Sequence, residues 1–91
     1  MKNGTTGKRR ITFTLRAEEG QTVSVAGTFN NWDTSKHKMK FKDGVYTVTA
    51  LIPKGHHEYK FVVNDVWCVD PECKQWTPNE VGSLNSVLNI D

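Results

Sequence analysis

The sequence predicts an all-β domain built as an antiparallel β-sandwich, and three observations support this fold class. About seven short runs alternate apolar and polar residues with a period of two. Turn-forming residues separate these runs about every 8 to 12 positions, and no segment shows the 3.6-residue period of a helix. A chain of 91 residues has room for one hydrophobic core, so the strands must form a single domain.

The first three strands follow from alternation. Residues 11–16 carry an apolar side chain at every second position, which is typical of a half-buried strand. Residues 23–27 repeat the pattern with two valines and end at a glycine. Residues 28–36 contain turn formers around two large aromatic residues and predict a structured loop. Residues 39–41 place Met and Phe on either side of a lysine, as a third strand would.

The middle of the chain predicts a hairpin and a long strand. Asp43-Gly44 is a hairpin signal, and residues 46–52 carry Tyr, Val, Ala and Ile at alternate positions. We expect these four side chains to face the core and the two intervening threonines to face away. Pro53-Lys54-Gly55 ends the strand.

The last strands surround one tight turn and one long loop. Residues 57–64 and 66–69 predict two strands joined at Asn64-Asp65. Asp70-Pro71 ends the second of them, residues 72–83 predict a long loop, and residues 84–90 predict the final strand.

Composition limits the domain organisation and the partners. Residues 1–8 are rich in Gly, Thr, Asn and Lys and predict a flexible tail, which leaves residues 9–91 as the domain. No apolar run suits a secretion signal or a membrane span, so we expect a cytoplasmic protein without a membrane partner. A net charge of +2 is too small to indicate nucleic acid. Cys68 and Cys73 are too few for a disulfide framework and are expected to be reduced.

The hairpin at Asn64-Asp65 predicts which side chains face outward. If these two residues form the turn, Val62 lies opposite Trp67 and Lys60 opposite Val69. One face then carries five residues that should face the core: Tyr59, Phe61, Val63, Val66 and Cys68. Trp67 is expected on the other face, with Lys60 as its diagonal neighbour.

An outward-facing tryptophan beside a lysine has two interpretations. The indole offers a platform for the C–H face of a sugar ring, or it covers the outer sheet surface as amphipathic side chains often do. A register slip of one residue would bury Trp67 instead. Trp32, in its loop, either caps the core or lines a site, and Trp76 is less defined still.

Four segments of the chain form a recognisable series. They are residues 25–32 (VAGTFNNW), Gly55 with residues 58–63 (EYKFVV), Trp67 with Asp70-Pro71, and residues 82–88 (GSLNSVL). In this order they resemble the glycogen-binding module, or carbohydrate-binding module family 48, and the resemblance covers residues 23–90. This module occurs in the β-subunit of the AMP-activated protein kinase and ahead of branching and debranching enzymes.

The resemblance implies an immunoglobulin-like β-sandwich that binds α-glucans: glycogen, starch or malto-oligosaccharides. It implies no catalysis and no cofactor. Two tryptophans would stack on glucose rings, an aliphatic residue would cover the sugar, and three polar side chains would bond to its hydroxyls. These carbohydrate-binding residues are Trp32, Lys60, Trp67, Val81, Ser83 and Asn85. The sequence departs from the family in having Val rather than Leu at position 81 and a loop over residues 70–80 that is a residue longer.

The sequence gives weaker support for other kinds of site. His56 and His57 are adjacent on a strand and point to opposite faces, so they do not predict a metal site. No pair of carboxylates is placed for glycoside hydrolysis. Lysines at every second position from 36 to 42 would suit an anionic partner, but they also protect an edge strand from pairing.

The sequence therefore predicts a glucan-binding module with a shallow aromatic site and a Kd of about micromolar to millimolar. The alternative is a regulatory β-sandwich that uses the same surfaces to recruit a glycogen-metabolism enzyme or a kinase. A glucan enzyme ranks third.

Overall fold

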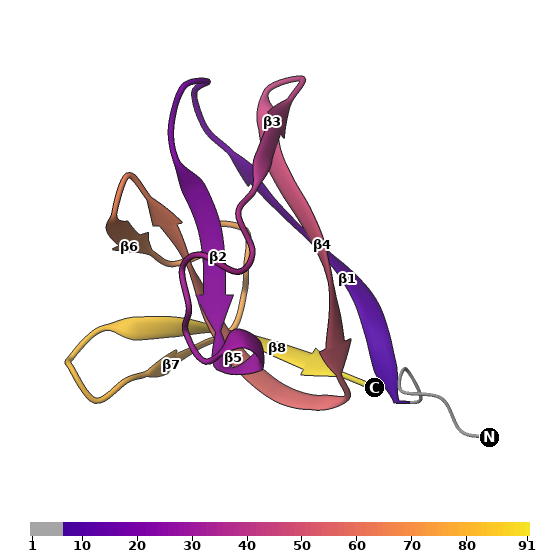
Figure 1. Ribbon diagram of the computed structural model, residues 1–91. Coiled ribbons are helices and arrows are strands. Elements are labelled where there is room, and N and C mark those ends of the chain that lie inside the picture. Colours follow the sequence, from indigo (N-terminus) through magenta and orange to yellow (C-terminus); the bar gives the residue numbers. More distant parts are fainter. Residues whose placement is uncertain (1–6) are drawn as a thin grey trace.

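The computed structural model describes residues 7–91 and confirms the all-β prediction, with two antiparallel sheets packed as a sandwich (Figure 1). Residues 1–6 of the expected tail lie outside the described residues. The elements are β1 (Lys8–Arg16), β2 (Val23–Gly27), the short 3-10 helix η1 (Thr28–Asn30), β3 (Lys40–Lys42), β4 (Val45–Pro53), β5 (Gly55–Val63), β6 (Val66–Cys68), β7 (Trp76–Pro78) and β8 (Leu84–Ile90).

One sheet has three strands in the order β1-β4-β3. β1 and β4 pair along nine positions, from Lys8 opposite Pro53 to Arg16 opposite Val45. The β3–β4 hairpin turns at Asp43 and Gly44, whose φ angles of 53° and 87° are both positive, as a two-residue hairpin loop requires. The predicted hairpin is therefore confirmed.

The other sheet has the order β2-β5-β8-β7, and β5 is its central strand. One edge of β5 pairs with β2, and the other edge pairs with β8 in its first half and with β6 in its second half. Between η1 and β3 the chain runs along β2, where Met39 N donates to Val23 O at 2.8 Å and Val25 N to His37 O at 3.1 Å. This segment connects the two layers.

The core lies between the sheets and consists of the side chains that alternation predicts. The aromatic ring of Phe13 on β1 meets that of Tyr59 on β5 edge-on, with centroids 5.1 Å apart. The apolar residues of β4 at positions 46, 50 and 52 are buried as expected. The core residues are Phe13, Leu15, Val23, Val25, Met39, Tyr46, Ala50, Ile52, Tyr59, Phe61 and Ile90.

The hairpin at Asn64-Asp65 has the predicted register: Val62 pairs with Trp67 and Val63 with Val66. Both turn residues have positive φ, and Asn64 Oδ1 accepts a hydrogen bond from Thr22 N at 2.9 Å. The expected core position of Val66 is wrong, because its side chain is 61% exposed. β6 ends after three residues, and it lies on the far side of β2 from the three-stranded sheet in the view of Figure 1.

Two strand boundaries also differ from the prediction. β1 begins at Lys8, three residues before the first alternating apolar residue. β7 lies within residues 72–83, which were expected to form a loop throughout. β7 has three residues and ends in a proline, so it lacks the alternation that would indicate a strand in the sequence. It nevertheless pairs with β8 and adds an edge strand to the sheet.

Candidate functional site

The outer face of the five-stranded sheet holds a groove of about 960 Å³. All six predicted site residues line it, although they come from two loops and three strands that are distant in sequence. The lining residues are Thr28, Trp32, Glu58, Lys60, Trp67, Pro78, Asn79, Glu80, Val81, Ser83 and Asn85.

Lys60 forms the floor of the groove from the middle of β5. Only 7% of the residue is exposed, because its neighbours cover the aliphatic stem. Its Nζ donates to Ser83 Oγ at 2.7 Å, the one hydrogen bond of this ammonium to another residue within 7–91. An ammonium has three N–H donors, so two of them remain for a ligand.

Trp67 and Trp32 form one wall. Trp67 is 44% exposed on the outer face, as the hairpin register predicts. The two indoles adjoin, with ring centroids 6.2 Å apart and planes inclined by 52°. For both tryptophans the structure therefore favours the interpretation in which the indole lines a site over the one in which it only covers the sheet or the core.

The loop that carries Trp32 is held by the buried amide of Asn30. Its Oδ1 accepts from Gly27 N at 3.0 Å, and its Nδ2 donates to Val25 O at 3.2 Å and contacts His37 Nδ1 at 2.8 Å. Trp32 has a φ of 58°, which is rare for a bulky residue, and its N donates to Gly27 O at 2.9 Å. The surrounding bonds thus impose a backbone conformation that presents the indole.

Gly27 allows this loop to approach β5. A methyl group at this position would meet the carbonyl oxygen of Glu58 and would lie 2.8 Å from both the ring of Phe29 and the Cβ of Tyr59. The backbone of Gly27 is extended, so lack of space and not its conformation requires glycine. The close contact brings the end of β2, and with it Trp32, to the edge of the groove.

The opposite wall is a tight loop organised by Asn79. Its Oδ1 accepts from Val81 N and from Ser83 N, each at 3.0 Å, and its backbone N donates to Ser83 O at 2.9 Å. Gly82 has a φ of 80°, which lets the chain reverse there. Val81 stands at the tip with 85% of its surface exposed, an unusual position for an aliphatic residue with no role in the core.

Asn85 lies deep in the groove and is almost fully buried. Its Oδ1 accepts from Asn79 Nδ2 at 3.1 Å and its Nδ2 donates to Glu58 Oε1 at 3.0 Å. The hydrogen bond from Asn85, followed by the contact with His56, holds the pKa of Glu58 below its ordinary 4.5 despite partial burial. The groove thus combines apolar surfaces with fixed donors and acceptors, a composition that suits a sugar ring with C–H faces and a hydroxyl rim.

Sequence reasoning missed five of the lining residues: Thr28, Glu58, Pro78, Asn79 and Glu80. The signal for Glu58 was available, since it shares the outward alternation of Lys60 two residues later on β5. Asn79 lies three residues before Gly82, a spacing that is consistent with a turn stabilised by the asparagine side chain. This pattern predicts a turn but does not indicate a binding site.

Trp76, left open by the sequence, does not line the groove. It begins β7 opposite Ser86, whose side chain faces the core, and it is 51% exposed at the edge of the sheet. Cys68 and Cys73 are free thiols. Cys73 lies near backbone oxygens of the β7–β8 region, with its Sγ 3.2 Å from Gln75 O.

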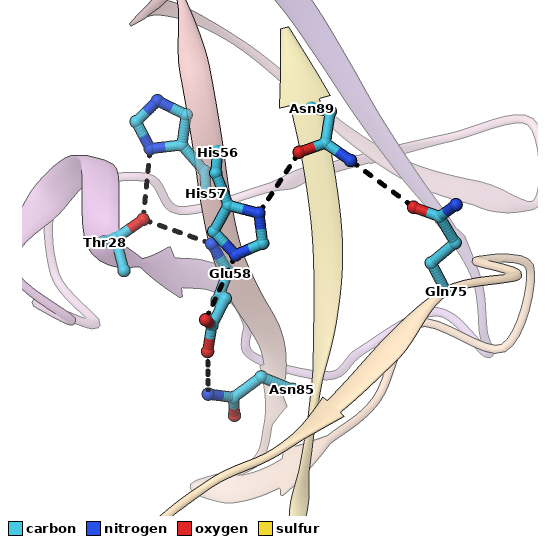
Figure 2. Close-up of polar contacts among 7 residues, drawn as sticks. All are labelled: Thr28, His56, His57, Glu58, Gln75, Asn85 and Asn89. Carbon is cyan, nitrogen blue, oxygen red and sulfur yellow. Dashed lines mark hydrogen bonds and ion pairs between the residues drawn. The ribbon is translucent and has the colours of Figure 1, made fainter.

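The two adjacent histidines have different partners. Figure 2 shows His56 in contact with Asn89 and Glu58, and His57 in contact with Thr28 Oγ1. His57 Nε2 also lies 2.9 Å from the carbonyl oxygen of Pro53. Among residues 7–91, no three His, Cys, Asp or Glu side chains converge in a way that could hold a metal ion. Nor does that part of the chain contain a helix of the length and apolarity that crossing a membrane demands.

Comparison with known proteins identifies the family. A family model for the glycogen recognition site of AMP-activated protein kinase matches residues 10–91. The 5'-AMP-activated protein kinase subunit beta-2 of Rattus norvegicus is 31% identical over 85 residues, which are 93% of this chain and 31% of that protein. The beta-1 subunit of Sus scrofa is 30% identical over 71 residues, or 78% of this chain and 56% of that protein.

The chain thus spans about a third of the length of the beta-2 subunits that it matches. The match nevertheless covers nearly the whole sandwich and every element that lines the groove. The chain belongs to the glycogen-recognition domain family of AMP-activated protein kinase, whose function is the non-catalytic binding of glycogen.

Proposed function

We propose that the groove on the five-stranded sheet binds α-glucan chains through the six residues singled out in the sequence. Two indoles stack on the C–H faces of glucose rings, an aliphatic side chain covers the sugar from the opposite wall, and three polar groups bond to hydroxyls. The stacking indoles are Trp32 and Trp67, the aliphatic side chain is Val81, and the polar groups are those of Lys60, Ser83 and Asn85.

The observation that carries this proposal is the convergence of all six side chains on one groove. The ammonium of Lys60 adds to it, because its aliphatic stem is covered and its charged end lines the groove. Ser83 accepts a hydrogen bond from only one of its three N–H groups. Sugar hydroxyls would satisfy the remaining two.

The angle between the planes of the two indoles favours a bent, α-linked glucan chain over a flat, extended one. Trp32 and Trp67 differ in plane by 52° across 6.2 Å, so neighbouring sugar rings that contact both must turn relative to each other. A bent glucan chain presents its rings in this way, whereas an extended, ribbon-like chain would lie flat on one indole only.

The charged groups of the groove do not favour hydrolysis. A glycosidase needs a carboxylic acid whose pKa is raised so that it can protonate the leaving group. The carboxyl group of Glu58 has a lowered pKa, which keeps it ionised. Glu58 is therefore suited to accepting hydrogen bonds and not to protonating a leaving group.

Titration with β-cyclodextrin or maltoheptaose, followed by tryptophan fluorescence and by amide NMR shifts, tests the proposal. We expect saturable changes with a Kd of about micromolar to millimolar, and loss of binding in the double variant Trp32→Ala with Trp67→Ala. No response at millimolar sugar would refute glucan binding by this chain. A response that survives the double substitution would refute the site.

The chain offers matched controls for this test. Trp76 has a similar exposed fraction to Trp67 but lies outside the groove, so Trp76→Ala should leave the Kd unchanged. Cellohexaose, a β-linked glucan, serves as the control ligand and should bind more weakly than maltoheptaose.

We further propose that the domain brings a kinase to glycogen, because the similar proteins are named as kinase subunits and extend well beyond this chain. The test is retention of AMP-activated protein kinase activity on glycogen beads when the domain is present in its natural chain. Retention should be lost with the double tryptophan substitution. Equal retention in that variant would refute a targeting role for the groove.

A further inference from the structure

A row of hydrogen-bonded side chains leads from the groove across the outer face of the five-stranded sheet (Figure 2). Glu58 stands at its centre. Its Oε1 accepts from Asn85 Nδ2 at 3.0 Å and its Oε2 lies 3.2 Å from His56 Nε2. Beyond His56, the row continues through Asn89 Oδ1 at 3.1 Å and from Asn89 Nδ2 to Gln75 Oε1 at 3.5 Å.

The strand register produces this row. His56 and Asn89 are direct partners in the β5–β8 ladder, and Glu58 pairs with Val87, so Asn85 is its diagonal neighbour. Alternation places all these side chains on the outer face. Backbone pairing in the centre of the sheet therefore fixes which groups meet.

The carboxylate determines the orientation of the Asn85 amide. An ionised carboxylate only accepts hydrogen bonds, so the nitrogen and not the oxygen of the amide must face Glu58. The oxygen then faces Asn79 Nδ2 at 3.1 Å. One N–H and one oxygen lone pair of Asn85 remain for a ligand in the groove.

We infer that Glu58 is a positioning residue of the glucan site, one that fixes the amide of Asn85 for hydroxyl recognition and is itself held by His56. The inference rests on the proposed function, since it assigns Glu58 a role through a residue that the proposal places on the sugar. A glutamate is ionised at neutral pH, so the hydrogen bond from Asn85 Nδ2 to Glu58 Oε1 keeps the amide in one orientation there.

Glu80 provides a contrast within the same groove. Glu80 also lines the groove, but among residues 7–91 its carboxylate has no hydrogen bond to another side chain. A simple effect of negative charge in the groove would affect both glutamates, whereas a positioning effect belongs to Glu58 alone.

Affinities for β-cyclodextrin of the wild-type protein and four variants test the inference: Glu58→Ala, Glu58→Gln, Asn85→Ala and Glu80→Gln. Glu58→Ala should raise Kd about five- to tenfold, the loss expected for one ordinary hydrogen bond between Asn85 and the sugar. Glu58→Gln should restore binding to within about twofold, because its Oε1 still accepts from Asn85. Glu80→Gln removes a negative charge from the same groove and so measures the effect of charge alone, and Glu58→Ala should raise the Kd more than Glu80→Gln does.

A double-mutant cycle shows whether Glu58 acts through Asn85. If it does, adding Glu58→Ala to Asn85→Ala causes no further loss. Fully additive losses would overturn the inference and indicate an independent contact with the sugar. The side-chain NH₂ signals of Asn85 give a second readout, since they should shift in Glu58→Ala and remain near their wild-type positions in Glu58→Gln.

The outcomes separate this inference from the proposed function. If the wild-type protein binds no sugar, glucan binding itself is refuted. If the wild-type protein binds and Glu58→Ala binds equally well, with the Asn85 signals unmoved, only the positioning role of Glu58 is refuted. The melting temperature and amide spectrum of each variant identify any loss that comes from unfolding.

Discussion

The outer faces of the two sheets share one architecture but differ in what they can bind. The outer face of the three-stranded sheet is formed by threonines, a valine, a leucine, a proline and five basic residues, and it has no carboxylate in the strands β1, β3 and β4. On this face Thr12 Oγ1 and Thr49 Oγ1 bond to each other at 2.9 Å. The other outer face has aromatic walls around a polar floor.

The difference arises at the strand ends and not in the strands. On the five-stranded sheet, the loop after β2 and the loop before β8 stand on either side of Lys60 and enclose it. The hairpin of the three-stranded sheet is a two-residue turn that adds no wall. A β-sandwich thus acquires a binding face where its loops enclose one sheet. Substitutions on the two outer faces test this contrast.

Trp67→Ala should affect binding most. A tryptophan at the centre of a binding surface typically contributes about 2 kcal/mol or more, which corresponds to a roughly thirtyfold higher Kd. Fluorescence titration with maltoheptaose measures the change, and Leu51→Ala on the outer face of β4 is the matched control for removing an exposed apolar residue. Equal losses in the two variants would contradict the contrast between the faces.

Gly27→Ala should disturb the fold and the groove together. The added methyl group meets the backbone of β5, and overpacking of this kind costs about 1–3 kcal/mol. Urea unfolding measures the loss, and Trp32 fluorescence in the folded variant shows whether the loop has moved. A variant with wild-type stability would show that β2 can move away from β5 at little cost.

Lys60→Met should weaken glucan binding about three- to tenfold without a comparable loss of stability. The substitution keeps the buried stem and removes the ammonium, and replacing a buried charge with an apolar group is often neutral or stabilising. Calorimetric titration and thermal unfolding of the same sample separate the two effects. A large drop in melting temperature would mean that Lys60 serves the fold first.

Stability should decrease in acid through Glu58. Its pKa in the folded protein is below the ordinary 4.5, mainly because Asn85 donates to it, so its ionised form favours folding above about pH 4.5. This contribution is lost as the pH falls through the folded-state pKa. Urea unfolding from pH 7 to 3 should therefore show a smaller decline in Glu58→Gln than in wild type, and parallel curves would count against the effect.

Removing the charges of the β3 edge should change glucan binding least. Lys40→Thr with Lys42→Thr leaves the groove intact, so the Kd should stay within about twofold of wild type. If these lysines protect an exposed edge, light scattering should show increased self-association. Weaker glucan binding without self-association would point instead to a role of the basic face in sugar recognition.

Much of this molecule could be predicted because alternation and a two-residue turn fix side-chain faces. The turn at Asn64-Asp65 alone determined the register that places Trp67 and Lys60 outward. The position of Val66 could not be predicted in this way, because alternation gives a face but not the extent of the opposite sheet.

The positions of the site residues that lie in loops could not be predicted from the local sequence. Val81 and Ser83 entered the predicted site only through family resemblance, since nothing in the five-residue loop between β7 and β8 indicates how it folds. Their positions depend on the side chain of Asn79, which replaces backbone pairing with two local hydrogen bonds. Trp32 likewise depends on a left-handed backbone conformation that Asn30 stabilises and that residue preference alone would not favour.

The central position of β5 has a consequence for hydrogen exchange. β5 has partners on both edges at Tyr59 and from Phe61 to Val63. Backbone amides that are paired in this way beside the core exchange only when the domain opens as a whole, whereas edge strands and loops open by local fluctuations. The strand that carries Lys60 thus contains the slowest-exchanging amides, and the loops that carry Trp32 and Val81 exchange faster. A bound glucan should therefore slow exchange most in the two loops and least in the strand beneath it.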